Sequence, residues 1–283
     1  KVRITLIAAV GGAVVNTVLD VLFVIVLNWG IAGSGVATLV AQWFMGLFLV
    51  IPAILWSRAD GASLRPRLAG IAAAGGDGLP LFIRTLAIRA AMVTTVACAA
   101  RMGTAVLAGF QAVNSSWNFA INMLDSVGIA GQTLVATALG AGSVQQARRL
   151  TRATGRAGLV TGAVIGTAFA VVGLFAGHFF SPTPHIQTLI AVAMGIFFPL
   201  QGWMMAIDGI LIGARDYRYL AVTCTLTAVV YVTLILILAN MVTPALTSDL
   251  MRTAVLWAAF NVVLMGGRGL SNGLRVRSDA WMR

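Results

Sequence analysis

Residues 14–23 read VVNTVLDVLF, an apolar run that carries two polar side chains, Asn16 and Asp20, one helical turn apart. The whole chain is similarly apolar. Of its 283 residues, 59% are hydrophobic and only 10% are charged, against roughly 25% charged in soluble domains. Its mean hydropathy is +0.95. This composition predicts a membrane protein, and a carboxylate within such a run needs a physical reason.

Eight apolar segments follow one another along the chain, each close to the roughly 20 residues that cross a bilayer. Only helices and closed barrels satisfy the backbone in lipid, and the segments do not alternate apolar with polar residues. We therefore expect an all-α, polytopic bundle of about eight transmembrane helices. The segments are residues 4–27, 31–56, 79–100, 103–138, 157–180, 186–212, 219–242 and 250–267.

A polar, basic and glycine-rich stretch, residues 57–78, divides these segments unequally. We interpret it as a cytoplasmic linker between a two-helix remnant, residues 1–56, and a six-helix unit, residues 79–270. Residues 271–283 then form a cytoplasmic tail. Residue 1 is Lys and no signal-peptide pattern is present, so we expect the chain to begin inside a longer protein.

The basic residues lie mostly in the gaps between segments, so the net charge of +11 indicates membrane topology rather than nucleic-acid binding. With residue 1 in the cytoplasm, all but four of the 19 Lys and Arg residues are expected on the inner side. Arg101 and Arg252 fall outside, and Arg84 and Arg89 lie within a segment. The inner set is Lys1, Arg3, Arg58, Arg65, Arg67, Arg148, Arg149, Arg152, Arg156, Arg215, Arg218, Arg268, Arg275, Arg277 and Arg283.

Several catalytic chemistries are excluded by residue counts. Lys1 is the only lysine, so no GxxxxGK[ST] phosphate loop for ATP exists, and the chain has no Glu for an HExxH zinc site. Ser34, between two glycines, fails the GxSxG pattern. Cys98 and Cys224 lie in apolar segments and are interpreted as core residues. We expect no enzyme, no catalytic residue and no cofactor, with an ion gradient as the energy source.

Asn16, Asp20 and Thr38 are expected to meet at one depth in the membrane. The turn after the first segment lies near residues 28–30, and Asp20 and Thr38 each lie eight residues from it, roughly 12 Å along their helices. A carboxylate at this depth usually faces a cavity and serves ion or proton movement. The alternative is an interhelical hydrogen bond, which Asn or Thr provides without a charge.

The fourth segment carries a polar stripe whose members all fall within about 80° around a helix. Such a stripe faces either a water-filled cavity or other helices, because lipid leaves its amides unsatisfied. The first alternative makes it the lining of a substrate cavity. The stripe consists of Gln111, Asn114, Asn118, Asn122, Asp125 and Gln132.

The sixth segment places Gln201, Met204, Met205 and Asp208 on one broad face, after a Gly195 and Pro199 pair that can kink the helix. Flexible Met beside a carboxylate suits a site for varied amphiphilic cations, and Met as ordinary gap filler is the alternative. We include Gln201, Met205 and Asp208 among the candidate cavity residues.

Two further features have structural interpretations. Arg84 is close enough to the cytoplasmic end of its segment to snorkel, whereas Arg89 lies deeper and is expected to pair with an acid or a carbonyl. Gly158, Gly162 and Gly166 repeat at four-residue spacing, the pattern of close helix approach.

Four runs together resemble the multidrug and toxic compound extrusion (MATE) transporters, in particular their DinF-like branch. NTVLDVLFVIVLNWGIAGSGVAT (residues 16–38) resembles the fifth and sixth helices of that family. PLFIRTLAIR (80–89), LDSVGIAGQTLVATALGAGSVQQARRL (124–150) and IDGILIGARDYRYL (207–220) resemble its seventh, eighth and tenth-to-eleventh helix regions.

The resemblance implies twelve helices in two six-helix lobes around a cavity that opens alternately to either side. This chain then holds the last two helices of the amino-terminal lobe and the whole carboxy-terminal lobe. Asn16, Asp20 and Thr38 match the polar cluster that binds the coupling proton or sodium ion, whose usual partner is an acid in the family's first helix. Asp125 and Asp208 resemble recurring acids of the carboxy-terminal lobe, without an assigned role.

The function expected on these grounds is secondary antiport by a monomer in the inner or plasma membrane, without ATP or nucleic acid. Small amphiphilic or cationic compounds leave in exchange for protons or sodium, with Asp20 as the coupling acid and no metal site other than sodium at Asp20. A flippase for a lipid-linked precursor is an alternative, although it would line its cavity with cations. A non-transporting membrane scaffold is another.

Overall fold

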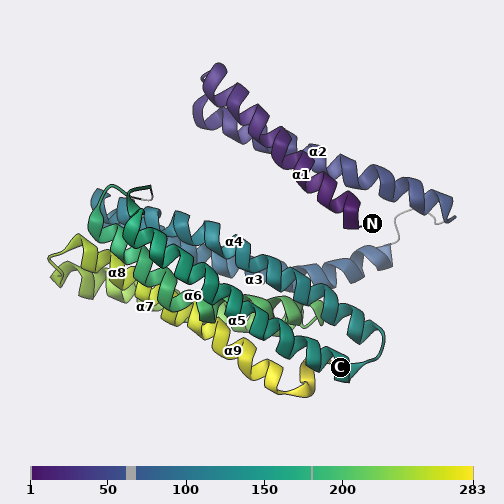
Figure 1. Ribbon diagram of the computed structural model, residues 1–283. Helices are drawn as coiled ribbons and strands as arrows, with labels where there is room; N and C mark the ends of the chain where they lie inside the picture. The colour runs from purple at the N-terminus through teal and green to yellow at the C-terminus, as the bar shows by residue number, and fades with distance from the viewer. Residues whose placement is uncertain (1, 62–67, 180, 283) are drawn as a thin grey trace. The chain divides into compact units, whose positions relative to one another are not determined.

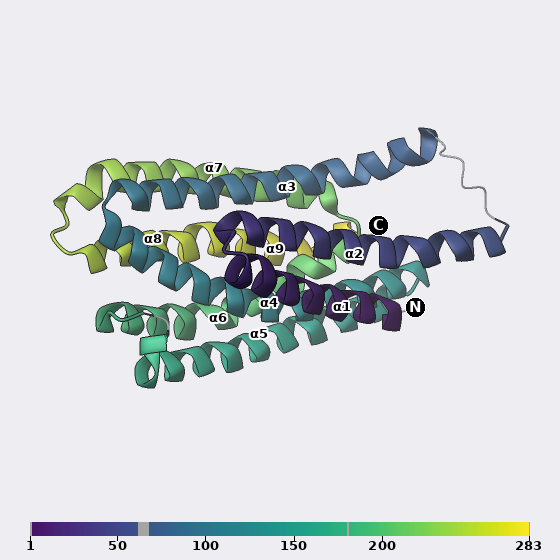
Figure 2. The same ribbon diagram turned by 90° about the horizontal axis from the view of Figure 1, so that it is seen from above.

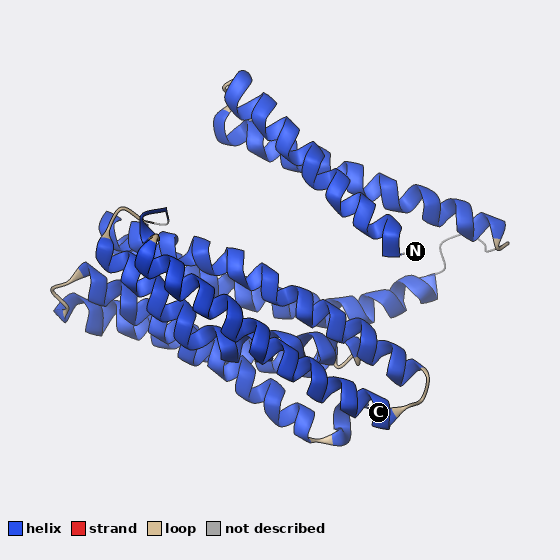
Figure 3. Cartoon of the chain, viewed as in Figure 1, coloured by secondary structure: helices blue, strands red, loops and turns tan. Residues whose placement is uncertain are grey.

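The computed structural model describes residues 2–61, 68–179 and 181–282, and these residues form helices and turns without a strand (Figures 1 and 3). Eight helical stretches are long and apolar enough to cross a membrane, which confirms the predicted all-α, polytopic fold. The chain divides into two compact units, Lys1–Ile71 and Ala72–Arg283.

The amino-terminal unit is a helical hairpin. Helix α1 (Val2–Asp20) continues as a π-helical turn η1 (Val21–Val26), and α2 (Gly30–Ala59) returns alongside it. Asn28 has a φ of 54° and Gly30 a φ of 55°, so the chain reverses at the expected place. Small residues keep the two helices close: a Cβ on Gly33 would lie 3.0 Å from the backbone of Phe23.

The carboxy-terminal unit contains the other six spans. Four of them are single α-helices, and the last two include π-helical or 3-10 turns. The elements are α3 (Leu68–Arg101), α4 (Thr104–Gly140), α5 (Val144–Phe175), η2 (Gly177–Phe179), α6 (Pro184–Gly213), α7 (Tyr217–Ile237), η3 (Leu238–Val242), η4 (Thr243–Ala245), α8 (Asp249–Ala259), η5 (Phe260–Met265), α9 (Gly266–Arg277) and η6 (Asp279–Met282).

Helices α5 and α6 run side by side for most of their length (Figure 2), as the glycine repeat predicts. Gly158 and Gly162 face the backbone carbonyls of Gly202 and Phe198, and a Cβ on Gly166 would lie 2.8 Å from the Met194 carbonyl oxygen. No side chain fits between these backbones. Helix α6 also packs on α4, so it forms the centre of the unit.

Three expected boundaries differ from the structure. Helix α5 begins at Val144 rather than near residue 157, because Ser143 caps it, accepting a hydrogen bond from the Gln146 backbone N–H at 3.4 Å, and arginine is a good helix former. The expected linker is largely helical where described, since α2 ends at Ala59 and α3 begins at Leu68; residues 62–67 lie outside the described residues. The expected tail is helical through Arg277.

Candidate functional site

The hairpin brings Asn16 and Thr38 together. Asn16 Nδ2 donates to Thr38 Oγ1 at 3.4 Å, and Thr38 Oγ1 donates to the Ser34 carbonyl at 3.0 Å. Two members of the expected cluster therefore meet, while no hydrogen bond joins Thr38 to Asp20, the residue expected at its depth, among the described residues.

Asp20 lies one turn beyond Asn16 as the last residue of α1, and it is half-buried. Its Oδ1 atom is shielded from solvent and has no hydrogen-bond partner among the described residues. The π-helical turn η1 begins at the next residue, and such turns occur frequently at functional sites. A shielded carboxylate oxygen without a donor is suited to hold a proton or a cation.

The polar stripe lies on the face of α4 that the core of its own unit leaves uncovered. The opposite face buries Phe110, Val113 and Leu124, whereas Asn122 and Asp125 are exposed. Gln111 is exposed as well, and Asn114, Asn118 and Gln132 are half-buried.

Among the described residues, the amides of the stripe bond along α4 itself. Asn122 Nδ2 donates to the Asn118 carbonyl at 2.6 Å, and Asn118 Nδ2 donates to the Asn114 carbonyl at 2.8 Å. Asn114 Nδ2 in turn reaches Gln111 Oε1 at 3.4 Å. Asn114 Oδ1 is shielded from solvent, whereas no described residue donates to the side-chain carbonyl oxygens of Asn118 and Asn122, which a substrate-facing surface requires.

Gln201 and Asp208 have a different environment from the cavity lining that their sequence pattern predicts. Each is only 3% exposed, in the interior of the carboxy-terminal unit. Gln201 Oε1 accepts from Trp117 Nε1 at 2.8 Å, and its amide nitrogen donates to Asn261. Met205 is half-buried and packs against the same core.

Asp208 is the centre of a buried ionic cluster drawn from three helices. Arg84 of α3 pairs with it, Arg268 of α9 lies at 3.2 Å, and Asn272 Nδ2 donates to its Oδ1 at 2.9 Å. Asn272 is fully buried and Arg268 is 5% exposed. The cluster holds two guanidinium groups on one carboxylate, so it carries a net positive charge.

This cluster corrects two sequence expectations. Arg84, expected to snorkel, is the residue that pairs with an acid, whereas Arg89, expected to pair, is exposed. Arg268, counted as an inner-side topology residue, is buried instead. The sequence carries one signal for this cluster. Arg268 and Asn272 are four residues apart in a glycine-rich helix, the same spacing that places Asn16 and Asp20 on one helix face.

Residues 80–237, more than half of the chain, match the family model described as MatE. The chain belongs to the MatE family. The matched region begins in α3 and ends with α7, so it lies wholly in the carboxy-terminal unit. The family expected from the sequence is thereby confirmed.

Curated relatives and solved structures agree with this MatE assignment. "Protein DETOXIFICATION 43" of Arabidopsis thaliana is 28% identical over 241 residues, which cover 83% of this chain and 45% of the relative. "Protein DETOXIFICATION 44, chloroplastic" of the same plant is 28% identical over 224 residues, 76% of this chain and 41% of the relative. This chain therefore spans less than half the length of these relatives.

Among solved structures, "Crystal structure of MATE in the bent conformation" is similar with a TM-score of 0.73 and 18% identity, covering 95% of this chain and 61% of that one. "Outward-facing conformation of a multidrug resistance MATE family transporter of the MOP superfamily" has a TM-score of 0.67 and 19% identity, with 95% and 62% covered. These similarities extend the MATE fold to nearly the whole chain, the helical hairpin included.

Proposed function

We propose that the intact MatE protein is a secondary antiporter that exports small amphiphilic or cationic compounds in exchange for protons or sodium. The observation that carries the proposal is Asp20, a half-buried acid in a membrane-spanning hairpin with a shielded, unpartnered carboxyl oxygen. Ionisable residues inside membrane spans mark ion and proton pathways. The distribution of Lys and Arg supports residues 1 and 283 on the cytoplasmic side of a cell membrane.

Ion movement and substrate export are coupled through two states of Asp20 that exclude each other, one with an ion bound and one without. A proton or sodium ion neutralises the carboxylate and favours one arrangement of the hairpin, while the charged, empty site favours the other. Export is driven if the substrate prefers the second arrangement, because a ligand shifts an equilibrium only through its different affinity for the two states.

The stripe on α4 is the proposed substrate contact. It is exposed or half-buried, neutral to acidic, and built mostly from amide side chains that can accept hydrogen bonds as well as donate them. Asp125 supplies its single carboxylate, which would attract a cationic substrate. Gln201 and Asp208 act in this proposal as the buried support of the lobe.

Transport by the whole protein in proteoliposomes tests the proposal, with tetraphenylphosphonium as the amphiphilic cation and separate proton and sodium gradients. Asp20→Asn keeps the size of the side chain but removes its charge, and we expect it to abolish gradient-driven export. Asp60→Asn, the same change in the turn after α2, should leave export intact. Normal gradient-driven export by a monodisperse Asp20→Asn protein would refute the coupling role.

A further inference from the structure

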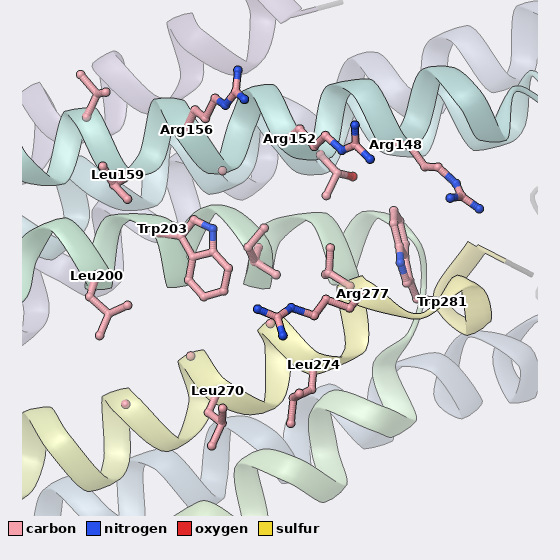
Figure 4. A pocket seen from close by; sticks show the side chains of 18 of the residues that line it. Arg148, Arg152, Arg156, Leu159, Leu200, Trp203, Leu270, Leu274, Arg277 and Trp281 are labelled. Carbon is pink, nitrogen blue, oxygen red and sulfur yellow. The ribbon is translucent and has the colours of Figure 1, made fainter.

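A pocket of about 1010 Å³ lies between α5, α6 and α9, at the end of the carboxy-terminal unit where α5 begins and the other two helices end (Figure 4). Arg148, Arg152 and Arg156 line it from successive turns of α5, and Arg277 lines it from α9. None of the described residues that line the pocket is acidic. This end of the pocket is therefore strongly positive.

The other end of the pocket is apolar. Three leucines line this end. Leu159 follows the arginines on α5, Leu200 lies on α6 one turn before Trp203, and Leu270 lies two turns before Arg277 on α9 (Figure 4). All three are about half exposed or more. Each lies farther along its helix from the positive end, so the surface changes from cationic to aliphatic towards the middle of the span.

Two tryptophans shape the polar part. The indole of Trp203 lies between two glycines: a Cβ on Gly155 would be 3.3 Å from its Nε1 atom, and one on Gly273 would be 2.8 Å from its outer ring edge. Trp281 is 2% exposed and lines the pocket, and its Nε1–H has no partner among the described residues. A buried N–H without an acceptor is costly and points to an external acceptor.

We propose that this pocket binds one anionic phospholipid. The phosphate accepts from the α5 arginines that line the pocket, from Arg277 and from the Trp281 Nε1–H, while an acyl chain follows the exposed leucines. Basic pockets between transmembrane helices are suited to acidic lipid headgroups, and the aliphatic extension favours a lipid over a soluble anion. The inference requires only that the unit spans a membrane, so it stands apart from the proposed antiport.

Native mass spectrometry of the chain in detergent, with equimolar dioleoyl phosphatidylglycerol and dioleoyl phosphatidylcholine, tests the site. Each arginine near an anionic lipid contributes roughly a fivefold factor, so Arg152→Gln/Arg156→Gln should weaken phosphatidylglycerol binding roughly 25-fold. The matched control is Arg149→Gln/Arg218→Gln, which removes two exposed arginines outside the pocket. It should change binding less than about twofold.

Trp281→Phe keeps an aromatic ring and removes the N–H, and we expect it to weaken phosphatidylglycerol binding by roughly two- to tenfold. Phosphatidylcholine binding should stay weak in every variant, and millimolar inorganic phosphate should not displace the bound lipid. Equal binding of the two lipids by the unchanged chain, equal losses in the two double variants, or displacement by inorganic phosphate would each overturn the proposal.

Discussion

The Arg268 guanidinium lies 3.2 Å from the Asp208 carboxylate in the interior of the carboxy-terminal unit, although the two residues are 60 positions apart in the chain. Arg84 contacts the same carboxylate from α3. Because one acid serves both the buried Arg268 and the partly buried Arg84, the cluster ties three helices together, and removing its single anion should disrupt it most.

Asp208→Asn should therefore be strongly destabilising. The change leaves one buried and one partly buried guanidinium group without a counter-charge, a loss expected to cost about 3–5 kcal/mol. Thermal unfolding in detergent, followed by circular dichroism, measures the effect. Arg84→Gln should cost less, because the pair between Asp208 and Arg268 remains.

The matched control for this change is Asp249→Asn. Asp249 is half exposed, and its carboxylate lies 3.3 Å from Arg252 at a helix start, so its loss should cost at most about 1 kcal/mol. An Asp208→Asn protein that unfolds at the same temperature as Asp249→Asn would show that the buried cluster contributes nothing to stability.

The closeness of α5 and α6 gives a second stability prediction. Gly162→Ala places a methyl group against the Phe198 carbonyl and should cost about 1–3 kcal/mol through forced separation of the helices. Gly46→Ala is the same change on α2 with open space around it, and it should be neutral or stabilising by up to about 1 kcal/mol. Unfolding midpoints of the two variants in one detergent provide the comparison, and equal midpoints would contradict the packing role.

The sequence predicts where the helices of this fold lie along the chain better than it predicts which residues contact each other between helices. Lipid leaves the backbone no alternative to internal hydrogen bonds, so eight apolar runs are enough to identify eight spans. The predicted start of a helix is wrong where the helix extends beyond the hydrocarbon region. Arg148 to Arg156 lower the hydropathy of the first turns of α5, but the helix continues through them.

Site residues were predictable where the contact is local. Asn16 and Thr38 belong to one hairpin with a short turn, so counting residues from the turn brings them near each other, although the count places Asp20 at the depth of Thr38 and the bond is made by Asn16, one turn away. Asp208 meets Arg84 from 124 residues away, and no spacing within a single helix reveals such a partner. Helical periodicity identifies a polar face, but it does not tell whether that face lines a cavity or is buried against other helices.

The exposed stripe on α4 gives a labelling prediction. In a whole protein whose own cysteines are replaced, Asn118→Cys should react with a membrane-impermeant maleimide, and tetraphenylphosphonium should slow the reaction. Ser116→Cys, two residues away on the buried face, should stay unlabelled. An Asn118→Cys protein that does not react from either side of the membrane would favour the scaffold alternative over a substrate cavity.

The contact between Asn16 and Thr38 separates ion coupling from simple helix packing. Thr38→Val keeps the shape of the side chain and removes the hydroxyl group that accepts from Asn16. An interhelical hydrogen bond of this kind contributes about 0.6 kcal/mol, so we expect roughly threefold weaker apparent affinity for the coupling ion, with maximal export retained. Thr17→Val is the control, because among the described residues the Thr17 hydroxyl bonds only to the Ala13 carbonyl of its own helix, at 2.9 Å. Export rates in proteoliposomes at graded proton or sodium concentrations give both quantities. If Thr38→Val lowers the unfolding temperature and leaves the ion dependence unchanged, the contact is a packing interaction and Asp20 acts without it.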